Sequence, residues 1–118
     1  MKQFMTAGGM KRRVLIVDDE IINRMMLGAM LEQTYETAFA SNGEEAMTAL
    51  RDPDANFSLI LLDLMMPVMD GFRVIETCQA DEQLRKIPII VMTAEKSAEV
   101  KSIRMGAADF IKIGRAHV

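Results

Sequence analysis

Residues 59–71 decide the fold, and they read Leu-Ile-Leu-Leu-Asp-Leu-Met-Met-Pro-Val-Met-Asp-Gly. The four aliphatic residues are long enough for a buried strand and too short for a membrane span, and the run stops at Asp63. Pro67 and the Asp70-Gly71 pair follow, and these residue types favour a loop. Open α/β sheets place their ligand chemistry where buried strands end. We therefore predict that Asp63 is the working residue.

The composition indicates one soluble globular domain. The chain has 118 residues, of which 50% are hydrophobic and 26% charged, so it can fill one core but not two. A formal net charge of -3 argues against a nucleic-acid footprint. The basic run at residues 11–13 is interpreted as part of a solvated lead-in, residues 1–12.

The sequence also carries no sign of export or membrane insertion. The single cysteine, Cys78, excludes an internal disulfide and a cysteine-rich metal site, which fits a reducing compartment. No apolar run approaches the ~20 residues of a membrane span, and the N-terminus lacks the apolar block of a signal peptide. We expect a cytoplasmic protein that contacts neither membrane nor nucleic acid directly.

Strand patterns and helix patterns alternate along the chain. Short aliphatic runs predict strands at 14–17, 37–40, 59–62, 89–92 and 110–111. Helical spacing predicts helices at 21–31, 43–50, 71–80 and 97–105, the second of them capped by Ser41 or Asn42. Such alternation is typical of an α/β fold with a doubly wound parallel sheet.

Two of these helices carry residues that could serve either the core or a function. In the first helix we expect the apolar stripe to fill the core, with Asn23 and Arg24 on the opposite face; the stripe comprises Ile22, Met25, Met26, Ala29 and Met30. In the third helix, Cys78 shares a face with Phe72 and Ile75. We interpret it as a core residue rather than a nucleophile.

Four functional groups are expected at one edge of this sheet. Asp18, Asp19, Asp63 and Thr93 all lie at carboxyl ends of predicted strands. Two carboxylates ~4 Å apart repel by on the order of 4 kcal/mol at an effective dielectric of about 20, so the cluster favours a bound cation. Mg²⁺ suits it, because this ion takes one or two carboxylates and completes its shell with water and phosphate oxygens.

Phosphoryl transfer is the reaction that these groups could serve. Asp63 can be the nucleophile and form an acyl phosphate. Asp19, supported by Asp18, can hold the metal. Thr93 offers a hydroxyl donor, and the small Ala94 beside it leaves room for the phosphoryl group.

Five ordered motifs between residues 13 and 111 resemble the receiver domain of two-component response regulators. They are Val-Leu-Ile-Val-Asp-Asp-Glu at 14–20, Asn-Gly-Glu-Glu-Ala at 42–46, Asp-Leu-Met-Met-Pro-Val-Met-Asp-Gly at 63–71, Val-Met-Thr-Ala at 91–94 and Gly-Ala-Ala-Asp-Phe at 106–110. The resemblance implies a flavodoxin-like five-stranded sheet in the order 2-1-3-4-5. It further implies phosphorylation of Asp63 by a partner histidine kinase or phosphotransfer protein, which would switch an output domain or effector outside this chain.

The resemblance also implies roles for individual residues. Mg²⁺ would be bound by Asp18, Asp19, Asp63 and the backbone carbonyl of Met65. Thr93 and Phe110 would form a switch pair that moves inward when the phosphoryl group arrives. The domain would be a phosphoacceptor that catalyses only its own phosphoryl transfer and dephosphorylation, and not an enzyme acting on other substrates.

The end of the chain departs from the family pattern. Receiver domains place a lysine three residues after the switch aromatic, and here Ile113 occupies that position. Lys112 comes one residue early, so strand alternation should point it away from the acids. Residues 113–118 are what a common sequencing adapter would encode, and we interpret them as a non-native tail after a receiver domain at 13–112. We expect the fifth helix to be missing, an apolar patch beside the first helix, and self-association or low stability as a result.

Two other functions stay open from the sequence. A phosphatase or phosphotransferase of the haloacid dehalogenase type needs a second aspartate two residues after its nucleophile, where this chain has Met65. A pseudo-receiver, or a fragment acting by protein contacts without phosphorylation, is the alternative that the missing lysine favours.

Overall fold

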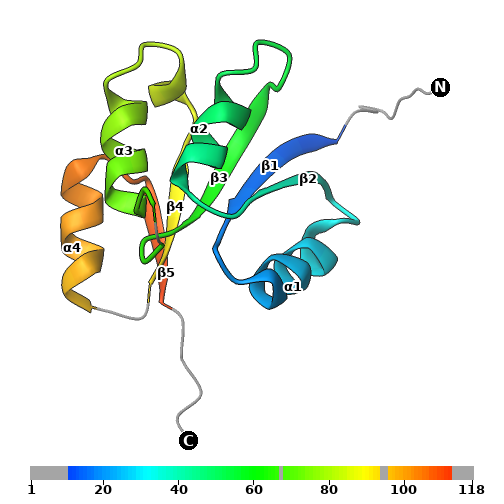
Figure 1. The fold of residues 1–118 in the computed structure, drawn as a ribbon, viewed down its shortest axis with the longest axis horizontal. Coiled ribbons are helices and arrows are strands. Elements are labelled where there is room, and N and C mark those ends of the chain that lie inside the picture. The colour runs from blue at the N-terminus through cyan, green and yellow to red at the C-terminus, as the bar shows by residue number, and fades with distance from the viewer. Residues whose placement is uncertain (1–10, 67, 94–95, 113–118) are drawn as a thin grey trace, which may run out of the picture.

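The computed structural model describes residues 11–66, 68–93 and 96–112, with residues 93, 96 and 112 described by their backbone only. Five parallel strands form one sheet in the order β2-β1-β3-β4-β5 (Figure 1). The strands are β1 (Arg12–Val17), β2 (Tyr35–Ala40), β3 (Phe57–Asp63), β4 (Ile89–Thr93) and β5 (Asp109–Lys112). The predicted doubly wound sheet and its strand order are confirmed.

Four helices connect these strands. They are α1 (Ile21–Leu31), α2 (Gly43–Leu50), α3 (Gly71–Gln79) and α4 (Lys96–Met105), and a 3₁₀ turn that the sequence did not predict, η1 (Leu84–Lys86), precedes β4. Within the described ranges, no helix has the length and hydropathy needed to cross a bilayer. The predicted elements therefore all exist, and their ends differ from the predicted ones by at most two residues.

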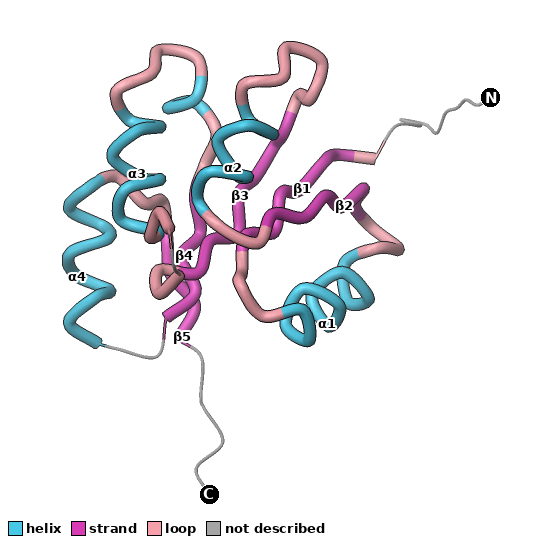
Figure 2. Tube along the Cα trace, viewed as in Figure 1, coloured by secondary structure: helices cyan, strands magenta, loops and turns pink. Residues whose placement is uncertain are grey.

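The two faces of the sheet are covered unequally. Figure 2 shows α2, α3 and α4 on one side of the strands and α1 on the other. Successive strand residues point to opposite faces, so Leu15 and Val17 pack toward α2, α3 and α4, whereas Val14 and Ile16 face α1. Among the described residues, the buried cluster on the three-helix side has nineteen members and the cluster on the α1 side has four. Most of the core therefore lies on one side.

Side-chain caps fix where α2 and α3 begin. The Asn42 side chain accepts a hydrogen bond from the Glu45 backbone N–H at 2.9 Å, so Asn42 is the cap of α2 and Ser41 is not. Glu45 in turn accepts from the backbone N–H of Ser41 at 2.8 Å, which ties the residue before the cap to the first turn of α2. Asp70 caps α3 by accepting from the Arg73 N–H at 3.0 Å. Asp70 is the last residue of the loop between β3 and α3, so this cap also fixes the end of that loop.

The prediction for the apolar stripe of α1 is wrong. Four of its large side chains are mostly exposed: Ile22 (64%), Met25 (64%), Met26 (58%) and Met30 (73%). Ala29 is exposed as well. The residues that pack on the sheet are instead Leu27, Gly28 and Leu31, and Asn23 and Arg24 are half-buried rather than facing solvent.

The physical reason is that α1 is apolar almost all the way round, so apolar spacing alone does not select the buried face. Gly28 lies against the ring of Phe39, so α1 approaches β2 closely through a residue with no side chain of its own. An exposed apolar patch was expected on the sheet beside the first helix, and the exposed apolar side chains lie mainly on α1 itself. Whether it causes self-association remains a prediction.

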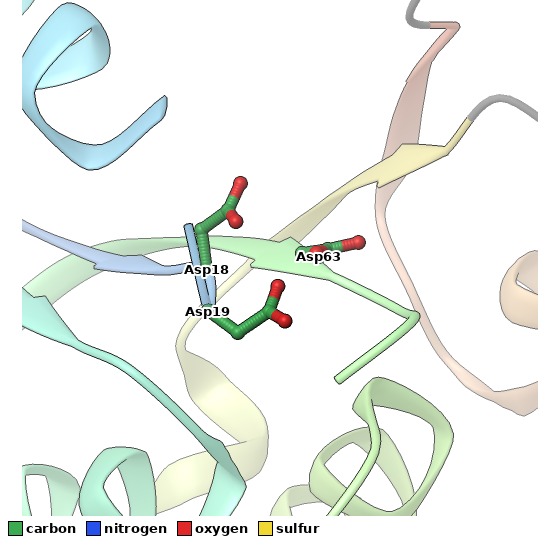
Figure 3. A group of neighbouring side chains, drawn as sticks. All are labelled: Asp18, Asp19 and Asp63. Atoms are coloured by element: carbon green, nitrogen blue, oxygen red, sulfur yellow. The ribbon is translucent and has the colours of Figure 1, made fainter. Parts of the chain in front are cut away.

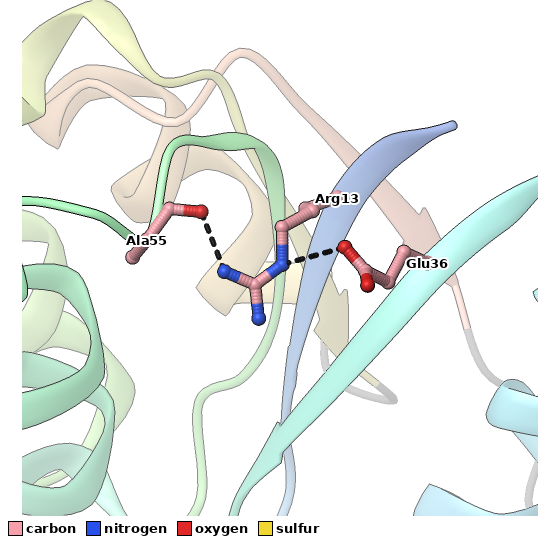
Figure 4. A network of polar contacts seen from close by, with 3 residues as sticks. All are labelled: Arg13, Glu36 and Ala55. Atoms are coloured by element: carbon pink, nitrogen blue, oxygen red, sulfur yellow. Dashed lines mark hydrogen bonds and ion pairs between the residues drawn. The ribbon is translucent and has the colours of Figure 1, made fainter. Parts of the chain in front are cut away.

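Arg13 ties three segments together at the amino end of β1 (Figure 4). Its Nη1 donates to the Ala55 carbonyl at 2.6 Å, and its Nε lies 3.0 Å from Glu36 Oε1 of β2. The guanidinium also stacks 4.7 Å from the centroid of the Phe57 ring. At this position the pairing of β1 with β3 shifts register. Arg13 therefore holds the irregular end of the sheet, opposite the edge that carries the acids. The interpretation of the basic run at 11–13 as a solvated lead-in is wrong for this residue, which lies half-buried in β1.

We predict that Cys78 is inert in the folded protein. Its side chain is fully buried, and burial raises the pKa of the thiol to about 11. At pH 8 only about one thiol in a thousand would then be the reactive thiolate. Iodoacetamide followed by mass spectrometry should label Cys78 slowly in buffer and completely in denaturant. Rapid labelling in buffer would show that α3 opens without global unfolding.

Candidate functional site

Three carboxylates meet at the carboxyl edge of the sheet. Asp18, Asp19 and Asp63 each offer one oxygen, and these three oxygens all lie within 4.8 Å of one another (Figure 3). The parallel register explains this, because Val17 of β1 pairs with Leu62 of β3 and the next residue on each strand is an aspartate. The predicted convergence of the acids is therefore found.

Asp18 is held by the turn that leads into α1. Only 2% of its surface is exposed. One carboxylate oxygen accepts from the Glu20 N–H at 2.9 Å, and the other accepts from Asn23 Nδ2 at 3.3 Å. Arg24 Nη1 donates to the Asp18 carbonyl at 2.7 Å. The first turn of α1 thus fixes the carboxylate and its backbone together.

Asp63 is held by the loop that follows β3. It is 8% exposed, and its Oδ1 accepts from the Met65 backbone N–H at 3.1 Å. The loop is fastened at both ends, because Gly71 N donates to the Leu64 carbonyl at 3.0 Å and Gly43 N donates to the Met69 carbonyl at 3.1 Å. These two hydrogen bonds therefore restrict the movement of the loop that follows the Asp63 carboxylate.

Two glycines make these close approaches possible. A Cβ on Gly71 would lie 2.6 Å from the Asp63 carbonyl oxygen, and a Cβ on Gly43 would lie 2.5 Å from the Met69 carbonyl oxygen. Both neighbours are backbone atoms, so neither can rotate away. The close approach of the loop between β3 and α3 therefore requires glycine at positions 43 and 71.

Electrostatic repulsion among the three carboxylates opposes their close approach. Burial raises the pKa of Asp18, the hydrogen bonds from Glu20 and Asn23 lower it in part, and the nearby acids Asp19 and Glu20 raise it further. At the separation found here, two carboxylates repel by about 3 kcal/mol for an effective dielectric of about 20. A cation between them would remove this repulsion.

The donor set fits a hard divalent cation. The oxygens that bind one Mg²⁺ each lie ~2.1 Å from the ion, so they are at most about 4.2 Å apart, and only small side-chain movements are needed to reach this from the separation found. All three groups are carboxylates, and Asp19 is open to solvent, which leaves space for the water that Mg²⁺ retains. Asp18, Asp19 and Asp63 could therefore hold the ion.

The other predicted site residues are placed less completely. The backbone of Thr93 ends β4 and pairs with Lys112, but the side chains of both lie outside the described part of the chain. Phe110 is half-buried and packs on the larger core cluster. Ala94 and Ile113 lie outside the described residues. The proposed ligand role of the Met65 carbonyl stays a prediction.

Sequence reasoning missed Asn23 and Arg24 as site residues. Both had been assigned to the solvent face of α1, yet both bond to Asp18. The available signal was their distance from the acid, since polar residues five and six positions after Asp18 fall in the first turn of the next helix.

Comparison with known proteins gives the family. Residues 14–112 match the response regulator receiver domain. The transcriptional regulatory protein ResD of Bacillus subtilis is 40% identical over 102 residues, which cover 84% of this chain and 40% of ResD. The response regulator PleD of Caulobacter vibrioides is 39% identical over 107 residues, which cover 86% of this chain and 23% of PleD.

A solved structure agrees with these relatives. The signal receiver domain of a signal transduction histidine kinase from Syntrophus aciditrophicus superposes with a TM-score of 0.76 at 35% identity, covering 86% of this chain and 77% of that one. The chain therefore belongs to the receiver domain family of two-component response regulators. It spans less than half the length of ResD and of PleD.

We predict that Asp18→Asn stabilises the protein in the presence of a chelator at pH 7. A raised pKa means that ionising Asp18 costs free energy in the folded state, and the variant removes this cost. The gain should be on the order of 1 kcal/mol, because water and salt screen part of the repulsion. Urea unfolding would measure it.

The stability gained by Asp18→Asn should depend on pH and on Mg²⁺. The cost is absent below the ordinary pKa of 3.8 and grows as the pH rises through the raised value, so the advantage of Asp18→Asn should vanish in acid. Added Mg²⁺ should stabilise the wild type more than the variant. The exposed and remote Asp54→Asn should change neither quantity, and a destabilised Asp18→Asn in chelator would contradict the repulsion argument.

We predict that Gly71→Ala weakens both folding and metal binding. The added methyl group must displace the backbone at Asp63 and Leu64, at a cost of about 2 kcal/mol. Urea unfolding would give the stability, and calorimetric titration with Mg²⁺ would give the affinity. Glu76→Ala, on the exposed face of the same helix, is the matched control and should leave both unchanged. Normal Mg²⁺ affinity in Gly71→Ala would mean that the loop position does not control the acids.

Proposed function

We propose that this domain is the phosphoaccepting module of a two-component phosphorelay, with Asp63 as the acceptor. Asp63 ends β3 beside Asp18 and Asp19, and this convergence is the observation that carries the proposal. The donor is a histidine kinase or a histidine phosphotransfer protein, and the reaction takes place in the cytoplasm. The domain is a signalling component and not an enzyme acting on other substrates.

The chemistry is an in-line displacement at phosphorus. A carboxylate oxygen of Asp63 forms the new bond to the phosphorus of a phosphohistidine while the phosphorus–nitrogen bond breaks. The bonding electron pair leaves with the imidazole, and Asp63 becomes an acyl phosphate. Bound Mg²⁺ would neutralise charge on the transferring oxygens and on the surrounding carboxylates.

The residues of this chain prepare the site for that reaction. Glu20 N–H and Asn23 fix the carboxylate of Asp18, so this proposed metal ligand is held in place before any ion binds, and the exposed Asp19 lies beside it. The Met65 N–H orients Asp63, and the Met65 carbonyl is proposed as a further ligand. Thr93 would then donate a hydrogen bond to the phosphoryl group, and Phe110 would move with it.

The output of the switch belongs to a partner or to a further domain. ResD is named a transcriptional regulatory protein and is more than twice as long as the matched region. By analogy, we propose that phosphorylation of Asp63 changes contacts between this domain and an effector. The domain itself has no need to touch nucleic acid or membrane.

A pseudo-receiver that acts by protein contacts alone is the second candidate. One observation favours it, namely that Ile113 stands where the family places a lysine. Without that ammonium group, the acyl phosphate would lose one stabilising partner. Metal binding does not depend on that position, so Mg²⁺ binding alone does not distinguish the two candidates.

Incubation with acetyl phosphate and Mg²⁺, followed by intact mass, tests phosphoacceptance directly. We expect the mass gain of one phosphoryl group in the wild type and in the control Asp54→Asn, and no gain in Asp63→Asn or in the presence of a chelator. An adduct that persists in Asp63→Asn would place the acceptor elsewhere. No adduct in the wild type, together with normal Mg²⁺ binding, would favour the pseudo-receiver.

A further inference from the structure

Val68 has a strained backbone conformation in the loop between β3 and α3. Its φ angle is 69°, which lies in the left-handed region that residues with a Cβ avoid. Among the described non-glycine residues, only Asn56 shares this region, with φ 52°, and asparagine tolerates it. Valine is branched at Cβ, so the same region is markedly less favourable for Val68.

Packing of the side chain does not offset this strain. Val68 is 74% exposed, and it lines an open groove together with Met69 and Phe72. An apolar side chain that stays in contact with water gains little from burial. Glycine or asparagine would adopt the same backbone conformation at a lower cost. The burial of Val68 therefore does not account for its conformation.

The attachments of the loop hold Val68 in this conformation. Hydrogen bonds to the backbone N–H groups of Gly43 and Gly71 fasten the loop to α2 and α3. Between these attachments the side chain of Met66 is buried, with 9% exposed. A strained residue persists only where its surroundings are fixed in this way, and such residues are common in switch regions.

The same loop is also attached to the carboxylate of Asp63. Its Oδ1 accepts from the backbone N–H of Met65 at 3.1 Å, and Met65 lies close to Val68 along the chain. An ionised carboxylate is a stronger acceptor than a neutral oxygen. In an acyl phosphate the carboxyl group of Asp63 is no longer ionised, so its hydrogen bond to Met65 weakens. One of the attachments that maintain the strain is thereby loosened.

We propose that Val68 stores strain in the unphosphorylated domain and that phosphorylation of Asp63 releases it. Released strain lowers the free energy of the phosphorylated state relative to the resting state, so the site holds a phosphoryl group with higher affinity. This inference rests on the proposed phosphoacceptor function. It makes Val68 a positioning residue, which acts on the acceptor through the loop and not through contact with the phosphoryl group.

An NMR titration with beryllofluoride in the presence of Mg²⁺ tests the proposal, because this tetrahedral anion can bind a carboxylate as a phosphoryl group does. Val68→Gly and Val68→Asn remove the strain from the resting state, so each should raise the dissociation constant by about fivefold. Val68→Ala keeps a Cβ and most of the strain, so it should bind as the wild type does. Asn56→Gly is the matched control, since it alters the other left-handed residue, just before β3, and it should leave the constant unchanged.

Urea unfolding without Mg²⁺ separates released strain from damage to the fold. Val68→Asn should be more stable than the wild type although it binds beryllofluoride more weakly, whereas a damaged fold would lower both quantities. Normal binding by the wild type and unchanged affinity in Val68→Gly and Val68→Asn would overturn the strain proposal alone. An equal loss of affinity in Val68→Ala would also overturn it, by assigning the effect to the side chain. A wild type that does not bind beryllofluoride would contradict the phosphoacceptor function and this inference with it.

Discussion

The repulsion among three carboxylates is the constraint on which the rest of this structure depends. The parallel pairing of β1 with β3 forces Asp18 and Asp63 to adjacent positions, and the following residue of the chain adds Asp19. The protein tolerates this because the buried strands behind the acids pack tightly and the neighbouring backbone donates to them. A site that is strained when empty gains the most from a bound cation, which links the stability of the fold to its ligand.

The two faces of the sheet are covered unequally, and they contribute to the site in different ways. The face under α2, α3 and α4 holds most of the core, and it also anchors both ends of the loop after β3 through Gly43 and Gly71. The face under α1 contributes little burial, yet α1 carries Asn23 and Arg24, which hold Asp18. The loop after β3 is therefore anchored by the layer of α2 and α3, and Asp18 is held by hydrogen bonds from α1.

The fold and the acidic cluster followed from the sequence because both rest on short-range signals. Two aliphatic runs that end in an acid define a buried strand and its functional end together, at Asp18 and at Asp63, and five strands that alternate with helices leave few other topologies. The orientation of α1 did not follow, since an almost uniformly apolar helix has no preferred face by composition. The orientation of α1 depends instead on the packing of Gly28 on Phe39 and on the hydrogen bond from Arg24 to the Asp18 carbonyl, and both contacts are made with segments outside the helix. The switch roles of Thr93 and Phe110 rest on the family resemblance alone.

Because few of its side chains pack on the sheet, α1 should open locally before the strands do. A helix attached to the sheet through little more than Leu27, Gly28 and Leu31 forms a unit of low local stability, so its amides should exchange with solvent before those of β1 or β3. Each such opening would remove Asn23 and Arg24 from Asp18 while the strands remain intact. Local opening of α1 would thereby determine the fraction of molecules in which Asn23 and Arg24 hold Asp18. This fraction would not depend on the global stability of the domain.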